Sequence, residues 1–305
     1  MSSMIFMNGE FVKKENAKIS VYDHGLLYGD GIYEGLRCYS GHVFQLSEHL
    51  ERLEQSARSL RINIPYSSEQ IKYFILETLR QNNLHNAYIR LVITRGVGAM
   101  GPDPRTCIQP NVIIITEDLP NVHGTSVKEK GLSLVIVSTR RDSVEGTSHE
   151  IKSLNYLNSI MARMEANEYN ADDAILLDPQ GFISESTICN IFMVSNKKLI
   201  TPCSSNGILK GITRQVVMSI AKEMGLEIEE RNITPHELIN AKEIFLTGTH
   251  AEIVGVTRIN NILIASGEIG RITKVIISKF REMTKNPMYG TPVYKTEVRE
   301  ENANA

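Results

Sequence analysis

Short apolar stretches bounded by turn residues occur along most of the chain, and each is of strand length. Near the start, residues 5–7 and 11–12 flank Asn8 and Gly9, a pair typical of the tight turn in a two-stranded hairpin. Further stretches of this kind predict strands at residues 32–39, 88–95, 112–116, 132–138, 173–178, 182–184, 191–194, 198–201, 243–247 and 253–256.

Apolar residues three and four positions apart predict amphipathic helices between these strands. One helix is expected to begin after Ser47 as its N-cap, and a second near Ser67, where Gln70 completes a capping box. Strands outnumber helices and do not alternate strictly with them, which favours an α+β fold over a doubly wound sheet. Later helices are expected at residues 157–164, 211–224, 234–237 and 272–280.

Polar segments punctuated by glycine, proline and aspartate divide the chain. Residues 21–31 contain three glycines and two aspartates, which predicts an irregular loop. Residues 117–130 are polar and lie between two strand-rich halves, as a linker would. We therefore predict a small N-terminal domain (1–118), an interdomain loop (119–130), a larger C-terminal domain (131–285) and a polar, mobile C-terminal arm (286–305).

The composition excludes several classes of protein. Hydrophobic residues make up 42% of the chain and charged residues 22%, as in globular proteins that bury a core. The net charge of −2 offers no basic surface to nucleic acid or an anionic membrane, and no apolar stretch is long enough to span a bilayer. The four cysteines show no CxxC spacing and the first residues lack a secretion signal, so we predict a cytoplasmic protein without a metal site.

Lys152 follows a polar stretch without periodicity and precedes a predicted helix. Positive partial charge at a helix start, or burial, reduces the preference of a lysine for its proton. A neutral amine is what carbonyl chemistry requires. Most lysines in such positions are solvated, however, so this position alone does not establish a reactive amine.

The sequence around Lys152, IKSLNY, resembles the cofactor-lysine segment of the fold-type IV pyridoxal-phosphate aminotransferases. That family includes the branched-chain and the D-amino-acid aminotransferases. Three further motifs follow in the family's order, GFISESTICNIF, GITR and FLTGTHAEI, and the resemblance runs from residue 4 to residue 280. It implies a small N-terminal α/β domain, a larger domain with a barrel-like β core, and pyridoxal 5′-phosphate as the cofactor.

The resemblance also implies a set of cofactor contacts. Lys152 would hold the aldehyde of the cofactor and later move a proton, and Glu185 would keep the pyridine nitrogen protonated. Tyr156 resembles the family tyrosine that binds the ring oxygen, and on a helix it would share a face with Lys152, four positions earlier. A phosphate needs backbone amides at a helix start and a cation, and the family assigns that role to Arg52, Gly211, Ile212, Thr213 and Thr249.

The substrate site is expected to combine apolar walls with one cation. Residues 28–37 resemble the branched-chain branch of the family, in which aromatic residues here wall an apolar pocket. In that branch, a residue matching Tyr88 helps bind the α-carboxylate, and one matching Arg90 pairs with the γ-carboxylate of glutamate. The resemblance gives these substrate-binding candidates: Tyr28, Tyr33, Gly35, Arg37, Tyr88, Arg90, Thr249 and His250.

Alternation along residues 88–95 separates two faces of that strand. Ile89, Leu91 and Ile93 should pack on the core, whereas Tyr88 and Arg90 should face a cavity or solvent. Two pairs of adjacent charged residues require no functional explanation. Arg140-Arg141 and Asp172-Asp173 are interpreted as solvated turn charges.

Three residues depart from the family pattern. Ile188 and Cys189 stand where small residues are usual, and so does His250 in the turn whose amides bind the α-carboxylate. The favoured hypothesis is ping-pong transamination between branched-chain L-amino acids and 2-oxoglutarate by a homodimer or higher homo-oligomer. The alternatives are a D-amino-acid aminotransferase, an aminodeoxychorismate lyase of the same fold, and a cofactor-binding protein that has lost turnover.

Overall fold

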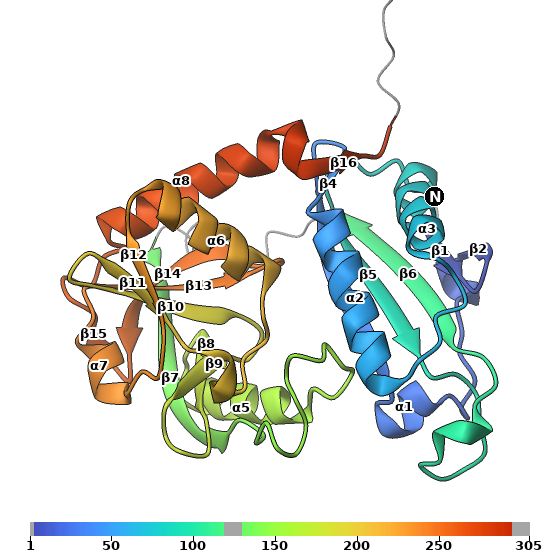
Figure 1. The fold of residues 1–305 in the computed structure, drawn as a ribbon, viewed down its shortest axis with the longest axis horizontal. Coiled ribbons are helices and arrows are strands. Elements are labelled where there is room, and N and C mark those ends of the chain that lie inside the picture. Colours follow the sequence, from blue (N-terminus) through green and yellow to red (C-terminus); the bar gives the residue numbers. More distant parts are fainter. Residues whose placement is uncertain (1–2, 119–129, 295–305) are drawn as a thin grey trace, which may run out of the picture.

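The computed structural model describes residues 3–118 and 130–294, which form two sheets with helices packed on each (Figure 1). The first sheet has seven strands in the order β16-β4-β3-β5-β6-β1-β2, and all its pairings are antiparallel. Helices α2 (Leu46–Leu60) and α3 (Ser68–Gln81) pack on this sheet. Its strands are β1 (Met4–Met7), β2 (Glu10–Lys13), β3 (Gly31–Tyr39), β4 (His42–Phe44), β5 (Ala87–Thr94), β6 (Asn111–Asp118) and β16 (Gly290–Pro292).

The second sheet has nine strands, ordered β12-β11-β10-β13-β14-β7-β8-β9 with β15 paired to β14. It mixes parallel and antiparallel pairs and curls into a half-barrel, so the predicted α+β class is confirmed. Its strands are β7 (Leu132–Arg140), β8 (Asp173–Leu177), β9 (Ile183–Ser186), β10 (Asn190–Ser195), β11 (Lys198–Thr201), β12 (Glu227–Glu230), β13 (Glu243–Gly248), β14 (Glu252–Ile259) and β15 (Ile262–Leu263). The helices of this half are α5 (Leu157–Glu168), α6 (Ile212–Glu223), α7 (Pro235–Ile239) and α8 (Arg271–Lys285).

Two local predictions in the first half are confirmed. Asn8 and Gly9 have φ of 53° and 99°, the left-handed pair that a tight hairpin turn requires, and they join β1 to β2. Ser67 caps α3, and its backbone and side chain form the predicted capping box with Gln70. Local turn and cap chemistry is therefore sufficient to specify these two boundaries.

The two faces of β5 are also as predicted. Ile89, Leu91 and Ile93 have no exposed surface and lie in the core beneath α2 and α3. Tyr88 and Arg90 project from the opposite face and are only partly buried. The first half thus presents a polar face of its sheet toward the second.

Two predictions about element boundaries are wrong. Helix α2 begins at Leu46, so its N-cap is Gln45 in a left-handed conformation and not Ser47. The expected loop at residues 21–31 contains the short helix α1 (His24–Tyr28), whose start is capped by the Asp23 side chain. A helix of this length is too short to produce an apolar period, so the pattern could not reveal it.

The C-terminal arm is the largest correction. Residues 286–294 were expected to be mobile, yet strand β16 pairs with β4 and Val293 is fully buried in the core of the first half. Arg80 Nε donates to the Val293 carbonyl at 2.6 Å. Helix α8 therefore carries the chain from the second half back to the first (Figure 1). The buried residues here are too few and too scattered to give a periodic signal.

The predicted interdomain loop, residues 119–130, lies outside the described residues except for Lys130, while Glu117 and Asp118 complete β6. Within residues 3–118 and 130–294, no helix is both long and apolar enough to cross a membrane.

Candidate active site

A cleft opens between the two halves of the molecule. Helix α2 of the first half contributes Arg52, and the remaining lining residues come from the second half. The structure thus brings together residues that are far apart in the sequence. All of the residues predicted to bind the cofactor line this cleft: Arg52, Lys152, Tyr156, Glu185, Gly211, Ile212, Thr213 and Thr249.

Lys152 lies in an extended segment and not at a helix start, because α5 begins only at Leu157. The segment is held by the edge of β3: Tyr33 N donates to the Lys152 carbonyl at 3.0 Å, and Leu154 N donates to the Gly31 carbonyl at 3.0 Å. The expected contribution of a helix end to Lys152 is therefore wrong. The first half of the molecule fixes the backbone of a lysine that belongs to the second.

Burial lowers the pKa of Lys152 to about 8, and the positive charges of Arg52 and Arg90 act in the same direction. Glu34 and Glu185 oppose this shift. The Lys152 Nζ lies 4.5 Å from the centre of the Tyr33 ring. The amine is therefore neutral for a useful fraction of the time near neutral pH, as proton transfer requires.

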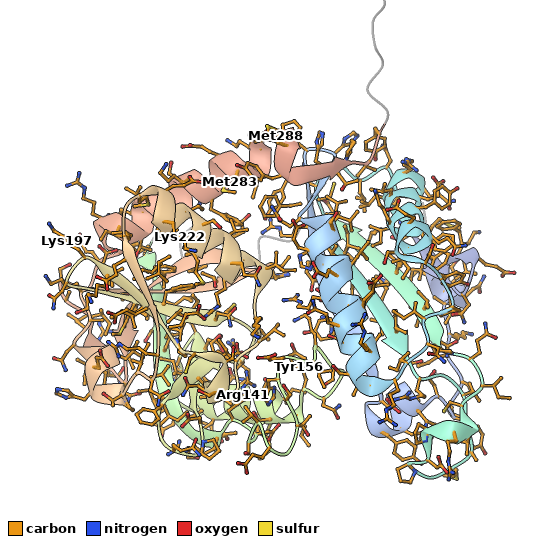
Figure 2. The ribbon with its side chains drawn as sticks, viewed as in Figure 1. Arg141, Tyr156, Lys197, Lys222, Met283 and Met288 are labelled. Atoms are coloured by element: carbon orange, nitrogen blue, oxygen red, sulfur yellow. The ribbon has the colours of Figure 1, made fainter. Side chains whose placement is uncertain are left out.

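Tyr156 is the N-cap of α5, so it does not share a helix face with Lys152 as expected. Both residues nevertheless line the cleft. The Tyr33 hydroxyl donates a hydrogen bond to the Tyr156 hydroxyl. Figure 2 shows Tyr156 between the two halves of the molecule, with Arg141 nearby on the side of the second sheet.

Glu185 on β9 is buried and accepts hydrogen bonds on both carboxylate oxygens. Arg141 Nη2 donates to Oε1, while Asn190 Nδ2 and the Leu209 amide donate to Oε2 at 2.8 and 3.2 Å. Burial raises the pKa of Glu185, and the Arg141 guanidinium and these donors oppose the rise. Hydrogen bonds directed at both oxygens favour the ionised carboxylate.

The prediction that both residues of each charged doublet are solvated is correct for one residue of each pair and wrong for the other. Arg140 and Asp172 are exposed as predicted, but Arg141 and Asp173 are buried. Both doublets lie at the ends of strands, β7 and β8, where neighbouring side chains point to opposite faces. One member of each doublet must therefore face the interior, where Asp173 accepts a hydrogen bond from Thr187 Oγ1 at 2.6 Å.

Gly211 is the N-cap of α6, and no side chain caps this helix. A Cβ on Gly211 would lie 2.1 Å from the Asn190 Oδ1, so any larger residue would displace the Asn190 side chain. The first amides of α6 consequently open on the cleft, where they and the helix dipole favour an anion. Arg52 reaches the same loop across the cleft, because its Nη1 donates to the Lys210 carbonyl at 3.0 Å.

The predicted substrate residues form a second group beside the cleft. The Arg90 guanidinium carbon lies 3.6 Å from the centre of the Tyr33 ring, and Tyr33 in turn faces the Lys152 amine. A Cβ on Gly35 would lie 2.3 Å from the Tyr88 hydroxyl, so glycine allows Tyr88 to cover that strand. Arg90 and Tyr33 thus place a cation and an aromatic wall next to the reactive lysine.

His250 closes this group from the second half, with its ring edge-on to Tyr88 at 4.9 Å. Arg37 Nη1 pairs with the Glu252 carboxylate at 2.9 Å and donates to the His250 carbonyl at 3.2 Å. Arg37 therefore anchors the turn that carries His250. Tyr28 lies apart from the group: it is 40% exposed, and its hydroxyl accepts a hydrogen bond from Gly101 N at 2.6 Å.

The structure accommodates the two departures in the β9–β10 turn. Cys189 is buried, and its Sγ would lie 3.0 Å from a Cβ on Gly248, so the glycine leaves room for the thiol. Ile188 lines the cleft with 61% of its surface exposed. An exposed apolar side chain inside a polar cleft offers a surface for a ligand ring to pack on.

The amino-transferase class IV family model matches residues 31–259. The chain belongs to this family. A relative from Methanocaldococcus jannaschii, named "Putative branched-chain-amino-acid aminotransferase", is 49% identical over 290 residues, or 95% of this chain and 99% of the relative. The predicted enzyme class, an aminotransferase, is thereby confirmed.

Solved structures of class IV aminotransferases match the fold closely. The crystal structure of the branched-chain amino acid aminotransferase of Escherichia coli has a TM-score of 0.93 and 32% identity, covering 96% of this chain and 100% of that one. The branched-chain amino acid aminotransferase of Thermoproteus uzoniensis, solved with norvaline, has a TM-score of 0.90 and 35% identity, covering 96% and 100%. The predicted fold-type IV architecture is confirmed.

The predicted cofactor, pyridoxal 5′-phosphate, is confirmed as that of the class IV aminotransferases, one of which is solved in complex with N-(5′-phosphopyridoxyl)-L-glutamate. The residues of the cleft fit this cofactor. Among the described residues, the buried Arg141 Nε and Thr247 Oγ1 both line the cleft and lack a hydrogen-bond partner, as expected of groups that bind a polar ligand. With Lys152, Glu185 and the start of α6, they supply an amine, an anion and a phosphate site.

The motifs did not single out several residues of the site. Asn190 and Thr247 stand inside the motifs quoted above and Glu34 inside residues 28–37, but none was given a role, and His49 lies outside all of these stretches. The sequence could still have indicated Glu34 and His49, because the apolar pattern places each of these polar residues on a face that should be buried. A buried polar side chain needs a partner, so such positions are worth testing for a site.

Proposed function

We propose that this class IV aminotransferase transfers the amino group between branched-chain L-amino acids (Leu, Ile and Val) and 2-oxoglutarate by a ping-pong mechanism. The observation that carries the proposal is the stacking of Arg90 on Tyr33 beside the Lys152 amine. An aromatic wall suits an apolar side chain, and the adjacent guanidinium suits the second carboxylate of glutamate. The names of similar proteins, and the L-glutamate adduct bound to one of the solved relatives, support the same substrates.

When bound, the cofactor supplies an electron sink that stabilises negative charge developing at the α-carbon of the substrate. The residues of the cleft supply the rest. The first amides of α6 and Arg52 would bind the phosphate, and Glu185 would hold a positive charge at the pyridine nitrogen. Lys152 Nζ, neutral part of the time, would accept the proton of the α-carbon and return it.

The proposal is tested by incubating the loaded enzyme with one amino acid at a time and measuring the 2-oxo acid formed per active site. We expect one equivalent from L-leucine and from L-glutamate, and none from D-alanine or D-glutamate. Product from the D-substrates would instead support the D-amino-acid alternative. Pyruvate and 4-aminobenzoate released from aminodeoxychorismate would support the lyase, and absence of product from every substrate would support the cofactor-binding protein.

Replacing Arg90 with methionine is expected to separate the two substrates. Loss of a charge-assisted contact to the γ-carboxylate should lower kcat/KM for L-glutamate by roughly ten- to one hundred-fold, whereas that for L-leucine should change little. The measurement is the ratio of the two kcat/KM values. A ratio equal to that of the unaltered enzyme would mean that another cation binds glutamate.

We also propose that the protein is cytoplasmic and forms a homodimer. Four apolar residues of the predicted amphipathic helix after Tyr156 are more than half exposed. Asn155, just before this helix, donates from Nδ2 to the carbonyl of Gly29, the C-cap of α1, at 3.2 Å, and the two helices lie at the same end of the molecule (Figure 1). The exposed apolar residues there are Leu26, Leu27, Tyr28, Val97, Met100, Ile108, Leu157, Ile160, Met161 and Met164.

A second copy of the chain would cover this surface, since apolar patches of such extent mark interaction sites. We expect sedimentation velocity to show a dimer, and the double change Met161→Glu with Met164→Glu to shift it toward monomer. Met288→Glu is the control, because Met288 is exposed at the opposite end of the molecule (Figure 2). A dimer unaffected by the double change would place the interface elsewhere.

A further inference from the structure

A buried cluster of polar residues lies behind the cleft, on the side of the first half. Glu34 on β3 has no exposed surface, and Arg52 Nε and Nη2 donate to its two oxygens at 2.8 and 2.7 Å. His49 Nδ1 is 2.7 Å from the second oxygen. Because an ionised carboxylate can only accept, this His49 nitrogen carries the hydrogen. The carboxylate is thus fully engaged, and Arg52 holds its pKa at about 2, against the effect of burial.

This arrangement determines how Arg52 meets a ligand. A guanidinium has five N–H donors, of which Arg52 uses two on Glu34 and one on the Lys210 carbonyl. The bidentate pair fixes the guanidinium plane. Arg52 also lines the cleft, so the two remaining N–H groups are available to an anion there.

The same cluster reaches Lys152. His49, Arg52 and Ser56 are buried along one face of α2, at helical spacings of three and four residues. Ser56 Oγ accepts a hydrogen bond from the backbone amide of Lys152 at 3.2 Å. Lys152 therefore lies within the field of both charges of the pair. The groups that influence its protonation include Arg52, Glu34, Glu185, Arg90 and Tyr33.

We propose that Glu34, supported by His49, is a positioning residue that orients Arg52 toward the phosphate of the cofactor and balances its charge beside Lys152. The inference rests on the proposed use of the cleft. Without Glu34, Arg52 would be free to turn away from the cleft, and its charge would act on Lys152 uncompensated. The uncompensated charge would lower the pKa of Lys152 further, so Glu34 influences both the direction in which Arg52 points and the pH at which the Lys152 amine becomes neutral.

The test is Glu34→Gln in the full-length protein, which keeps the shape of the side chain and removes its charge. We expect the affinity for pyridoxal 5′-phosphate to fall roughly tenfold, and the affinity for pyridoxal, which lacks the phosphate, to stay within about twofold. A merely structural role would weaken both ligands alike. Asp30→Asn is the matched control, since Asp30 forms a similar bidentate pair with Arg95 at 2.8 and 3.0 Å outside the cleft.

The second readout is the pH dependence of Lys152 acetylation in the cofactor-free protein, followed by mass spectrometry. Because Glu34 raises the pKa of Lys152, its neutralisation should move the midpoint of labelling to lower pH. Should Glu34→Gln fail to fold, His49→Ala is expected to produce both changes at smaller size, and His49→Asn, which restores a donor, to reverse them.

The inference would be overturned if folded Glu34→Gln, or His49→Ala in its place, kept both the preference for the phosphorylated ligand and the labelling midpoint of the unaltered protein. Neither readout requires turnover. If the unaltered protein transaminates L-leucine but the variants match it in both readouts, the inference alone fails. If both readouts change but the unaltered protein acts on none of the amino acids, the proposed function alone fails.

Discussion

Lys152→Met is expected to lower the rate of transamination by about four orders of magnitude or more, because it removes both the cofactor's attachment point and the base. The initial rate with L-leucine and 2-oxoglutarate measures this loss. Lys210→Met is the control, since Lys210 lies near the same cleft and its amine pairs with Glu150 on the surface. Lys210→Met should stay within a few-fold of the unaltered enzyme. Retention of more than about one part in a hundred of the activity by Lys152→Met would remove Lys152 from the catalytic role.

The same substitution is expected to stabilise the cofactor-free protein at pH 7. Burial lowers the pKa of Lys152 to about 8, whereas a lysine in an unfolded chain titrates near about 10.4. Between these values the unfolded state binds more protons, so this residue's contribution to stability improves as pH rises from 8 to 10. Below pH 8 the buried ammonium is destabilising. Thermal unfolding should therefore show a higher midpoint for Lys152→Met at pH 7, and a smaller difference at pH 10.

The family motifs located the cofactor site better than the local physical argument did. All predicted cofactor residues line one cleft, although Lys152 and Tyr156 are not on one helix as that argument assumed. Pairing of residues 152–154 with β3 replaces the helix. This pairing is a contact between distant segments, and no periodicity near Lys152 could encode it.

Arg141 shows what alternation could have revealed. It was taken for a surface charge because it stands beside Arg140 in a polar stretch, yet the strand before it runs to Arg140 and reverses the direction of successive side chains. The predicted strand ended at residue 138, two residues too early. The apolar pattern defines strand ends poorly, so a charged residue near a strand end should be considered both as an exposed and as a buried residue.

The apolar residues of α5 are not the residues that this helix buries. Leu157, Ile160, Met161 and Met164 follow the period of a buried face, but the face that is buried carries Ser159, Ala162 and Ala166. Small residues allow the helix to pack closely on β7 and β8. An apolar period therefore does not establish that the same chain buries the apolar face.

Glu185→Gln is expected to lower the rate of the half-reaction with L-leucine by roughly one hundred- to one thousand-fold, the cost of removing one preorganised group that stabilises developing charge. Glutamine cannot hold a proton at the pyridine nitrogen, so the electron sink weakens. In addition, the buried Arg141 loses the carboxylate that neutralises it. Single-turnover formation of 4-methyl-2-oxopentanoate measures the effect.

Two further variants separate charge from packing. Glu185→Asp keeps the charge on a shorter side chain and should recover part of the rate, whereas Glu230→Gln should leave it unchanged. Glu230 is a matched control because its carboxylate pairs with the Nη2 of another buried arginine, Arg214, at 2.6 Å. Neither residue of this pair lines the cleft. If Glu185→Asp is as slow as Glu185→Gln, geometry and not charge limits the reaction. The hydrogen bonds from Arg141, Asn190 and Leu209 would then be the essential feature, because they fix where both carboxylate oxygens lie.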